Sequence, residues 1–347
     1  MKKFFSSISR SSKTKHSNSS NDNQMPASGP STRDYASDNL NPWNAFDCLP
    51  SKPRRKAKQL QDSIEQNSAR MDESLEFYAK AVVGTLLCNE QPTTQITHLD
   101  INNLEKIISP YNQKYEYLNL RSFDGRKDFV DSVSSWRTPG ICFRGVMRLG
   151  ESDDLHHIAL DVKNHSDGHT TVIALEPAMA TALGNLKGYN ELRKNLKASL
   201  GDKVSFAVIE AGAQKSAVDC IMFSLNYALR AYYNRDTFTD WHNDLKNTGT
   251  IDNKYPPPQN LIFLEHENLC ILNGMELLPA SFYKHAHAKS TLGELESVRP
   301  GISSSSLGEG ESLADRMKSF RVNRGERSYS SSIELSRARK IRKAIES

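Results

Sequence analysis

Residues 155–177 carry the sequence LHHIALDVKNHSDGHTTVIALEP, in which two apolar runs flank a short polar segment. The polar segment, 164–168, has the composition of a hairpin turn. The pattern therefore predicts two antiparallel strands, over 156–163 and 170–175. Pro177 lacks the N–H that a strand needs and is expected to end the second strand.

Outward from this hairpin, apolar spacing predicts further strands and several helices. Strands are expected at 141–149 and 204–209, and helices at 71–88, 103–109 (stopped by Pro110), 178–199, 217–233 and 237–246, whereas 261–290 is expected to be mostly helical or irregular. Helices before and after a three-stranded antiparallel sheet predict an α+β fold with a small central sheet.

Composition divides the chain into three predicted regions. Residues 1–69 open with a Ser/Asn-rich stretch and are expected to be disordered, although a charged stretch at 52–66 is a candidate helix start. Residues 70–300 are expected to form the core, and 301–347 a flexible linker with a basic C-terminal segment. Basic segments can bind polyanions, but no nucleic-acid-binding motif accompanies them, so no nucleic acid is expected.

The five cysteines are scattered without a CxxC pair, which favours a reducing compartment over disulfides or a metal site. No apolar run reaches transmembrane length. Lys2 stands where N-myristoylation needs glycine, so no such lipid anchor is expected.

His156, Glu176 and Cys220 follow one another in the chain, and Gln214 stands six residues before the cysteine. The two strands of the hairpin should place Glu176 beside His156. A thiol needs a base, and the base needs a group to orient it, so the three residues are a candidate catalytic triad. A glutamine amide in the loop before Cys220 could donate to an oxyanion.

Each of these residues also has a purely structural interpretation. Cys220 is predicted at a helix start, which favours a thiolate, yet free cysteines are most often buried core residues. We prefer His156 over His157 because His156 shares the apolar strand face of Ile158 and Leu160, expected to face the core. Such a site would act on acyl groups, and the residues alone do not separate a protease from an acyltransferase.

The motifs resemble those of a known family. The order His, acidic, Gln, Cys is similar to the Ulp-type cysteine peptidase clan. The stretches around His156 (with ALDVK at 159–163), LEPA at 175–178, DCIMFS at 219–224 and SFYKH at 281–285 resemble the YopJ family of bacterial type III secreted effectors. The resemblance spans about 70–300 and implies a Ulp-like core with a helical regulatory region.

Members of this family move acetyl groups from acetyl-CoA to Ser, Thr or Lys of host proteins. The resemblance therefore implies that His156 is the base, Glu176 its orienting group, Cys220 the acetyl-carrying nucleophile and Gln214 an oxyanion donor. It also implies secretion into a host cell, with action in the host cytoplasm or nucleus. A Ulp-like protease with the same triad and a non-catalytic binder of host proteins are the alternatives.

The family is activated by inositol hexakisphosphate, a polyanion that needs several cationic partners. By the resemblance, Lys284, Lys289, Arg321 and Arg324 are expected to form this site. Lys284 or Lys289 is also expected to be autoacetylated, because a tethered lysine has a high effective concentration.

Overall fold

The computed structural model describes residues 49–136, 138–150, 154–251, 262–266, 269–308 and 310–347. The described part belongs to one compact unit. Most of the N-terminal segment expected to be disordered lies outside the described residues.

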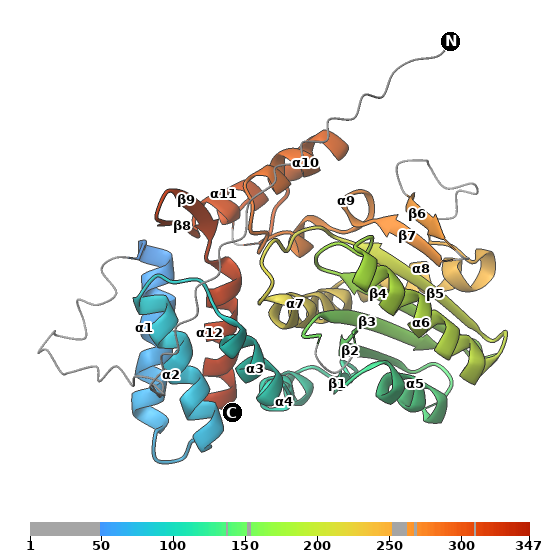
Figure 1. Ribbon diagram of the computed structural model, residues 1–347, viewed down its shortest axis with the longest axis horizontal. Coiled ribbons are helices and arrows are strands. Elements are labelled where there is room, and N and C mark those ends of the chain that lie inside the picture. The colour runs from blue at the N-terminus through green and yellow to red at the C-terminus, as the bar shows by residue number, and fades with distance from the viewer. Residues whose placement is uncertain (1–48, 137, 151–153, 252–261, 267–268, 309) are drawn as a thin grey trace, which may run out of the picture. The chain divides into compact units, whose positions relative to one another are not determined.

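A mixed sheet forms the centre of the fold (Figure 1). Its seven strands run in the order β1-β2-β3-β4-β5-β7-β6. The bounds are β1 Leu120–Phe123, β2 Cys142–Arg148, β3 His157–Asn164, β4 Thr170–Glu176, β5 Val204–Glu210, β6 Ile262–His266 and β7 Leu269–Asn273. The predicted hairpin is confirmed, since β3 pairs antiparallel with both β2 and β4.

The α+β class is confirmed, but the sheet is larger than expected. Strand β1 was not predicted, and the expectation of a helical or irregular 261–290 is wrong at β6 and β7. These strands have only four or five residues each, too few for a clear alternation. β5 pairs in parallel with β4 and β7, so the C-terminal ends of all three reach one edge of the sheet.

Helices cover both faces of the sheet (Figure 1). α7 packs on β2 and β3 from one side, and its near-continuous apolar sequence fits its burial. α5 and α6 pack on the other side, against Ile158 and Leu160. The helices of this region are α3 Thr94–Asn102, α4 Leu104–Lys114, α5 Arg126–Ser135, α6 Leu183–Leu200, α7 Cys220–Tyr233, α8 Arg235–Thr248, α9 Gly274–Leu277 and α10 Ser290–Val298. Pro110 lies inside α4 instead of ending it.

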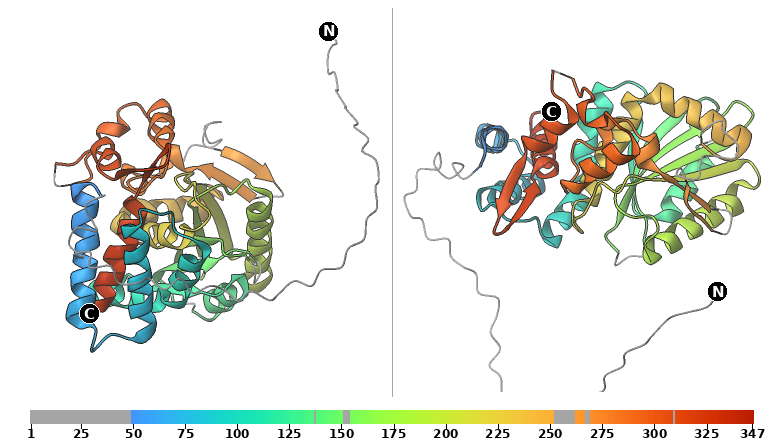
Figure 2. Two further views of the ribbon diagram at one scale, coloured as in Figure 1. Left: turned by 60° about the vertical axis from the view of Figure 1, so that its left-hand side comes forward. Right: turned by 90° about the horizontal axis from the view of Figure 1, so that it is seen from above.

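Segments from both ends of the described chain pack together. α1 Ser51–Asn67, α2 Glu73–Leu87 and α12 Ser332–Ile345 lie side by side (Figure 1, Figure 2). The expected disorder of 1–69 is therefore wrong for 51–67, where Ala57, Leu60 and Ile64 are buried. Although the segment is highly charged, these three apolar residues recur at helical spacing and therefore form one buried stripe along α1.

The C-terminal region is ordered as well, which corrects the expected flexible linker. It contains the 3-10 turn η4 Ile302–Ser304, α11 Leu313–Lys318, the hairpin β8 Arg321–Arg324 with β9 Arg327–Ser330, and α12. Ser312 and Asp315 form a capping box that starts α11. Within the described residues, no helix is both long and apolar enough to cross a membrane.

Candidate active site

Glu176 ends β4 and is completely buried, with 0% of its side chain exposed. Its Oε2 accepts hydrogen bonds from Nε2 of His156 at 2.8 Å and from the hydroxyl of Tyr189 at 2.7 Å. Its Oε1 accepts from the main-chain N–H of Ala178 at 2.7 Å. Three donors therefore hold the carboxyl group of Glu176 in one orientation.

His156 lies one residue before β3, where its main-chain N–H donates to Asp154 over 2.8 Å. Burial alone would lower the pKa of the imidazole, but the Glu176 charge and the Cys220 sulfur raise it to about 10. Since Nε2 is bound to Glu176, Nδ1 is the ring nitrogen that remains for a reacting group.

Cys220 is the first residue of α7 and is 1% exposed. Its Sγ donates to the main-chain carbonyl of Leu155 at 3.2 Å, which places the sulfur beside the residue that precedes His156. Cys220 therefore lies at the positive end of the α7 dipole, where the first main-chain N–H groups have no partner within the helix. The structure thus gathers the three candidate residues at one edge of the sheet.

Gln214 lies in the loop between β5 and α7 and is 5% exposed. Its main-chain N–H donates to the carbonyl of Pro177 at 2.8 Å, which ties the loop to the segment after Glu176. Its Nε2 donates to the carbonyl of Ser216 at 2.5 Å. Gln214 therefore lies near the end of β4, but its side-chain amide is hydrogen-bonded to a carbonyl of its own loop.

His157 makes different contacts from His156, although it shares the carbonyl of Leu155 with Cys220. Its Nδ1 donates to the carbonyl of Leu155 at 2.8 Å, and burial lowers the pKa of its ring to about 4. The structure places His156 against Glu176, but the strand-face argument for preferring His156 is wrong. Both faces of β3 are buried, and Ile158 faces α5 and α6, not α7. His156 lies just outside the strand, where alternation no longer dictates direction.

Two further groups at the site had no clear signal in the sequence. Tyr189 lies in α6 among ordinary helix residues, yet its hydroxyl reaches Glu176. Asp219 precedes Cys220, and its carboxylate accepts from Arg337 of α12 at 2.8 Å. Arg337 also binds Asp100 of α3, so α3 and α12 both hold the start of α7.

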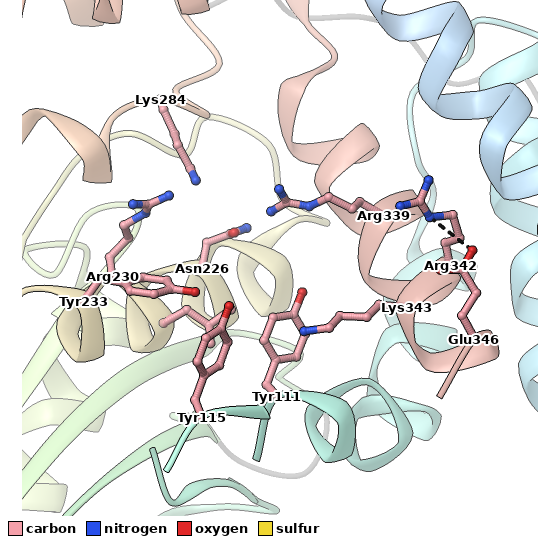
Figure 3. A pocket seen from close by; sticks show the side chains of 11 residues that line it. Tyr111, Tyr115, Asn226, Arg230, Tyr233, Lys284, Arg339, Arg342, Lys343 and Glu346 are labelled. Carbon is pink, nitrogen blue, oxygen red and sulfur yellow. Dashed lines mark ion pairs between the residues drawn. The ribbon is translucent and has the colours of Figure 1, made fainter. Parts of the chain in front are cut away.

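A cationic cavity of about 410 Å³ lies between α7, α12 and the segment that carries Lys284. Lys284, Arg230 and Arg339 point into a common space (Figure 3). The other charged or phenolic side chains that line it are Tyr111, Tyr115, Tyr233, Arg342, Lys343 and Glu346. Burial lowers the pKa of Lys284, and the positive charges of Arg230, Arg339, Arg316 and Lys56 lower it in the same direction, to about 6.

The four basic residues expected to hold an activator do not form one site. Lys284 lines this cationic cavity, whereas Lys289 and Arg321 line a second cavity of about 730 Å³. Arg324 makes a two-pronged ion pair with Glu334, at 2.8 and 2.6 Å. The grouping expected from the resemblance is therefore corrected, because these residues lie in three different surroundings.

A buried carboxylate, an imidazole and a thiol at a helix N-terminus are the equipment of an enzyme that carries an acyl group on cysteine. The chain belongs to the YopJ serine/threonine acetyltransferase family, whose model matches residues 55–343. It is thus a serine/threonine-protein acetyltransferase.

Relatives agree with this assignment. A serine/threonine-protein acetyltransferase of Sinorhizobium fredii is 35% identical over 202 residues, which cover 58% of this chain and 76% of that protein. The acetyltransferase HopZ1a of Pseudomonas syringae pv. syringae is 29% identical over 258 residues, covering 68% and 69%.

Solved structures show the same fold. HopZ1a in complex with inositol hexakisphosphate and CoA superposes with a TM-score of 0.72 at 24% identity, covering 86% of this chain and 99% of that one. AvrA with the same two ligands gives 0.61 at 22% identity, covering 84% and 97%.

Proposed function

We propose that this acetyltransferase works through an acetyl-cysteine intermediate on Cys220. The observation that carries the proposal is the Glu176–His156 pair, with the sulfur of Cys220 held beside it. The thiolate of Cys220 attacks the acetyl carbonyl of acetyl-CoA. The C–S bond to CoA then breaks, and CoA leaves as a thiol after it takes a proton from His156.

In the second half-reaction the same histidine acts as a general base, whereas in the first it acts as a general acid. Once Cys220 carries acetyl, its negative charge is gone, and one of the causes that raise the pKa of His156 disappears. The imidazole is then a base able to take the proton of a Ser, Thr or Lys acceptor. The acceptor attacks the thioester, and the thiolate of Cys220 is restored. Gln214 donates its amide to the oxyanion in both steps after release from Ser216.

Inositol hexakisphosphate binds, in this proposal, in the cationic cavity around Lys284. Arg230, Lys284 and Arg339 converge there, and Arg342 and Lys343 add charge from the same helix as Arg339. Their mutual repulsion is unfavourable without an anion and is relieved by one. The named HopZ1a and AvrA structures contain this ligand.

Acetyl-CoA enters, we propose, through the second cavity. This cavity is lined by apolar Leu292 and Met317 and by cationic Lys289, Lys318 and Arg321, which suits a nucleotide with phosphates.

Lys289 is exposed at the start of α10 and is the more accessible of the two lysines expected to become autoacetylated. Lys284 has its pKa lowered to about 6, which favours the neutral amine that attacks a thioester.

The family also suggests a bacterial effector that is secreted into a host cell and acetylates host proteins there. The test is incubation of the pure protein with labelled acetyl-CoA, with and without inositol hexakisphosphate. Label should appear on the wild-type protein and be absent from Cys220→Ala. Cleavage of ubiquitin-like substrates without label would instead support a protease, and neither activity would support a binder.

A further inference from the structure

His287 contacts the Gln214 loop on both sides of Gln214. The main-chain N–H of His287 donates to the carbonyl of Ala213 at 3.2 Å. The main-chain N–H of Lys215 donates to Nδ1 of His287 at 3.0 Å. The residue before Gln214 and the residue after it are thus both bound to one histidine, from a segment more than seventy positions further along the chain.

The second ring nitrogen reaches the nucleophile segment. Because Nδ1 accepts a hydrogen bond, the neutral ring carries its proton on Nε2. Nε2 lies 3.4 Å from Oδ2 of Asp219, the residue directly before Cys220. The Asp219 carboxylate is itself anchored by Arg337 and by the hydroxyl of Ser216.

The ring of His287 has little freedom to move. Its side chain is 10% exposed, and its ring meets the ring of Phe223 edge to face, with 5.0 Å between centroids. Phe223 lies in the first turn of α7, so the same packing links His287 to the helix that carries Cys220. A histidine held in this way can fix the main chain at Lys215 through Nδ1.

We propose that His287 is a positioning residue for acetyl transfer. It holds the loop so that the amide of Gln214 meets the oxyanion that forms at Cys220. It touches neither the acetyl group nor CoA, and the inference rests on the roles proposed above for Gln214 and Cys220. Hydrogen-bond donors to an oxyanion must be preorganised, so a loop that drifts loses rate without losing substrate binding.

Three substitutions separate the two ring contacts. Asparagine places an acceptor near the Nδ1 position and can keep the bond from Lys215. Glutamine places its amide near the Nε2 position and can keep only the contact with Asp219. Alanine removes both. The measurement is the single-turnover rate of acetyl transfer from acetyl-CoA to Cys220, with inositol hexakisphosphate present, as a function of acetyl-CoA concentration.

We expect His287→Ala and His287→Gln to lower the maximal rate about 10- to 100-fold, less than the roughly 100- to 1000-fold cost of removing an oxyanion donor outright, with the half-saturating concentration unchanged. His287→Asn should recover most of the rate. His169→Ala is the matched control, because His169 also makes a side-chain hydrogen bond, to Ser205, but at the start of β4, the end opposite Glu176. It should keep the wild-type rate.

A double-mutant cycle tests whether His287 acts through Gln214. In a Gln214→Ala background the amide is already absent, so His287→Ala should cost little more. A wild-type rate for His287→Ala, an asparagine variant no better than the glutamine variant, or losses that multiply would each overturn the inference. If Gln214→Ala itself keeps the full rate, the proposed oxyanion role is wrong. If Gln214→Ala loses rate but His287→Ala keeps the full rate, the oxyanion role stands and the positioning role of His287 is wrong.

Discussion

The guanidinium of Arg337 donates to the carboxylate of Asp219 at 2.8 Å, although the two residues are 118 positions apart. Their side chains are 1% and 2% exposed. Arg337 belongs to α12 and Asp219 directly precedes Cys220, so the last helix is joined to the start of the nucleophile helix. Arg337 also binds Asp100, so one cation balances two buried carboxylates.

Arg337→Met should destabilise the fold by about 3–5 kcal/mol, because it leaves buried carboxylates without their cation. The free energy of unfolding from chemical denaturation measures this. Arg339→Met is the control on the same helix. It removes a charge from the cationic cavity and should leave the stability of the ligand-free protein equal or higher. A loss for Arg337→Met no larger than that of the control would refute the prediction.

His156→Ala should lower acetyl transfer on the order of 10³-fold or more, as loss of a triad member does. His157→Ala should cost far less rate, because its ring is bound to Leu155 and not to Glu176. Steady-state transfer to an acceptor protein measures both variants. The reverse ranking would show that His157, not His156, is the base.

Glu176→Gln should lower the pKa of His156, because the carboxylate charge helps to raise it to about 10. A folded-state pKa above the unfolded value of about 6.5 means that the pair stabilises the protein fully below that value. This contribution is lost as the pH rises through 10. The stability difference between the wild type and Glu176→Gln should therefore be largest at mildly acidic pH and shrink in strong alkali.

NMR titration of His156 checks the same point directly. The wild-type ring should stay protonated through neutral pH, and the variant ring should titrate at lower pH. Tyr189→Phe is the control, because it removes a donor to Glu176 but keeps the charge. An unchanged titration of His156 in Glu176→Gln would contradict the electrostatic account.

Lys284 should take up a proton when inositol hexakisphosphate binds. With a pKa of about 6 it is mostly neutral at neutral pH, and a polyanion beside it favours the charged form. Calorimetry in buffers of different ionisation enthalpy should show about one proton more taken up by the wild type than by Lys284→Arg, which is always charged. Equal proton uptake in the two proteins would place the ligand elsewhere.

The same pKa has a consequence for the ligand-free protein. Between the folded pKa of about 6 and the ordinary lysine pKa of 10.5, the unfolded chain binds more protons than the folded one, so stability rises with pH. Lys284→Met removes this dependence. It should therefore stabilise the ligand-free protein at neutral pH, which thermal unfolding without the polyanion would show. A destabilised Lys284→Met would contradict the depressed pKa.

The hairpin and its two catalytic candidates could be predicted from the sequence because they depend on neighbours in the chain. A turn at 164–168 sets the pairing of β3 with β4, and this brings His156 and Glu176 together. Cys220 could be placed at a helix start for the same reason. The strand-face argument for His156 was less secure, since helices bury both faces of β3.

The grouping of charges was not predictable in this way. Lys284, Lys289, Arg321 and Arg324 were grouped by the family resemblance, yet they lie in three different surroundings. The basic C-terminal segment was expected to follow a flexible linker and to bind polyanions, but Arg337 and Lys340 are 1% and 0% exposed. Composition records how many charges a segment has, and not which of them will find partners.

The local sequence by itself determined the strand pairing, the helix that begins at Cys220 and the order of the catalytic candidates, because short-range backbone geometry and apolar periodicity act between near neighbours. Only the tertiary structure decided that α12 returns to Asp219, that His287 binds the loop on both sides of Gln214, and that Arg230, Lys284 and Arg339 face one cavity. Those contacts join residues distant in the chain. They form because packing the apolar faces of separate helices and strands brings their polar side chains together, and no local pattern encodes that result.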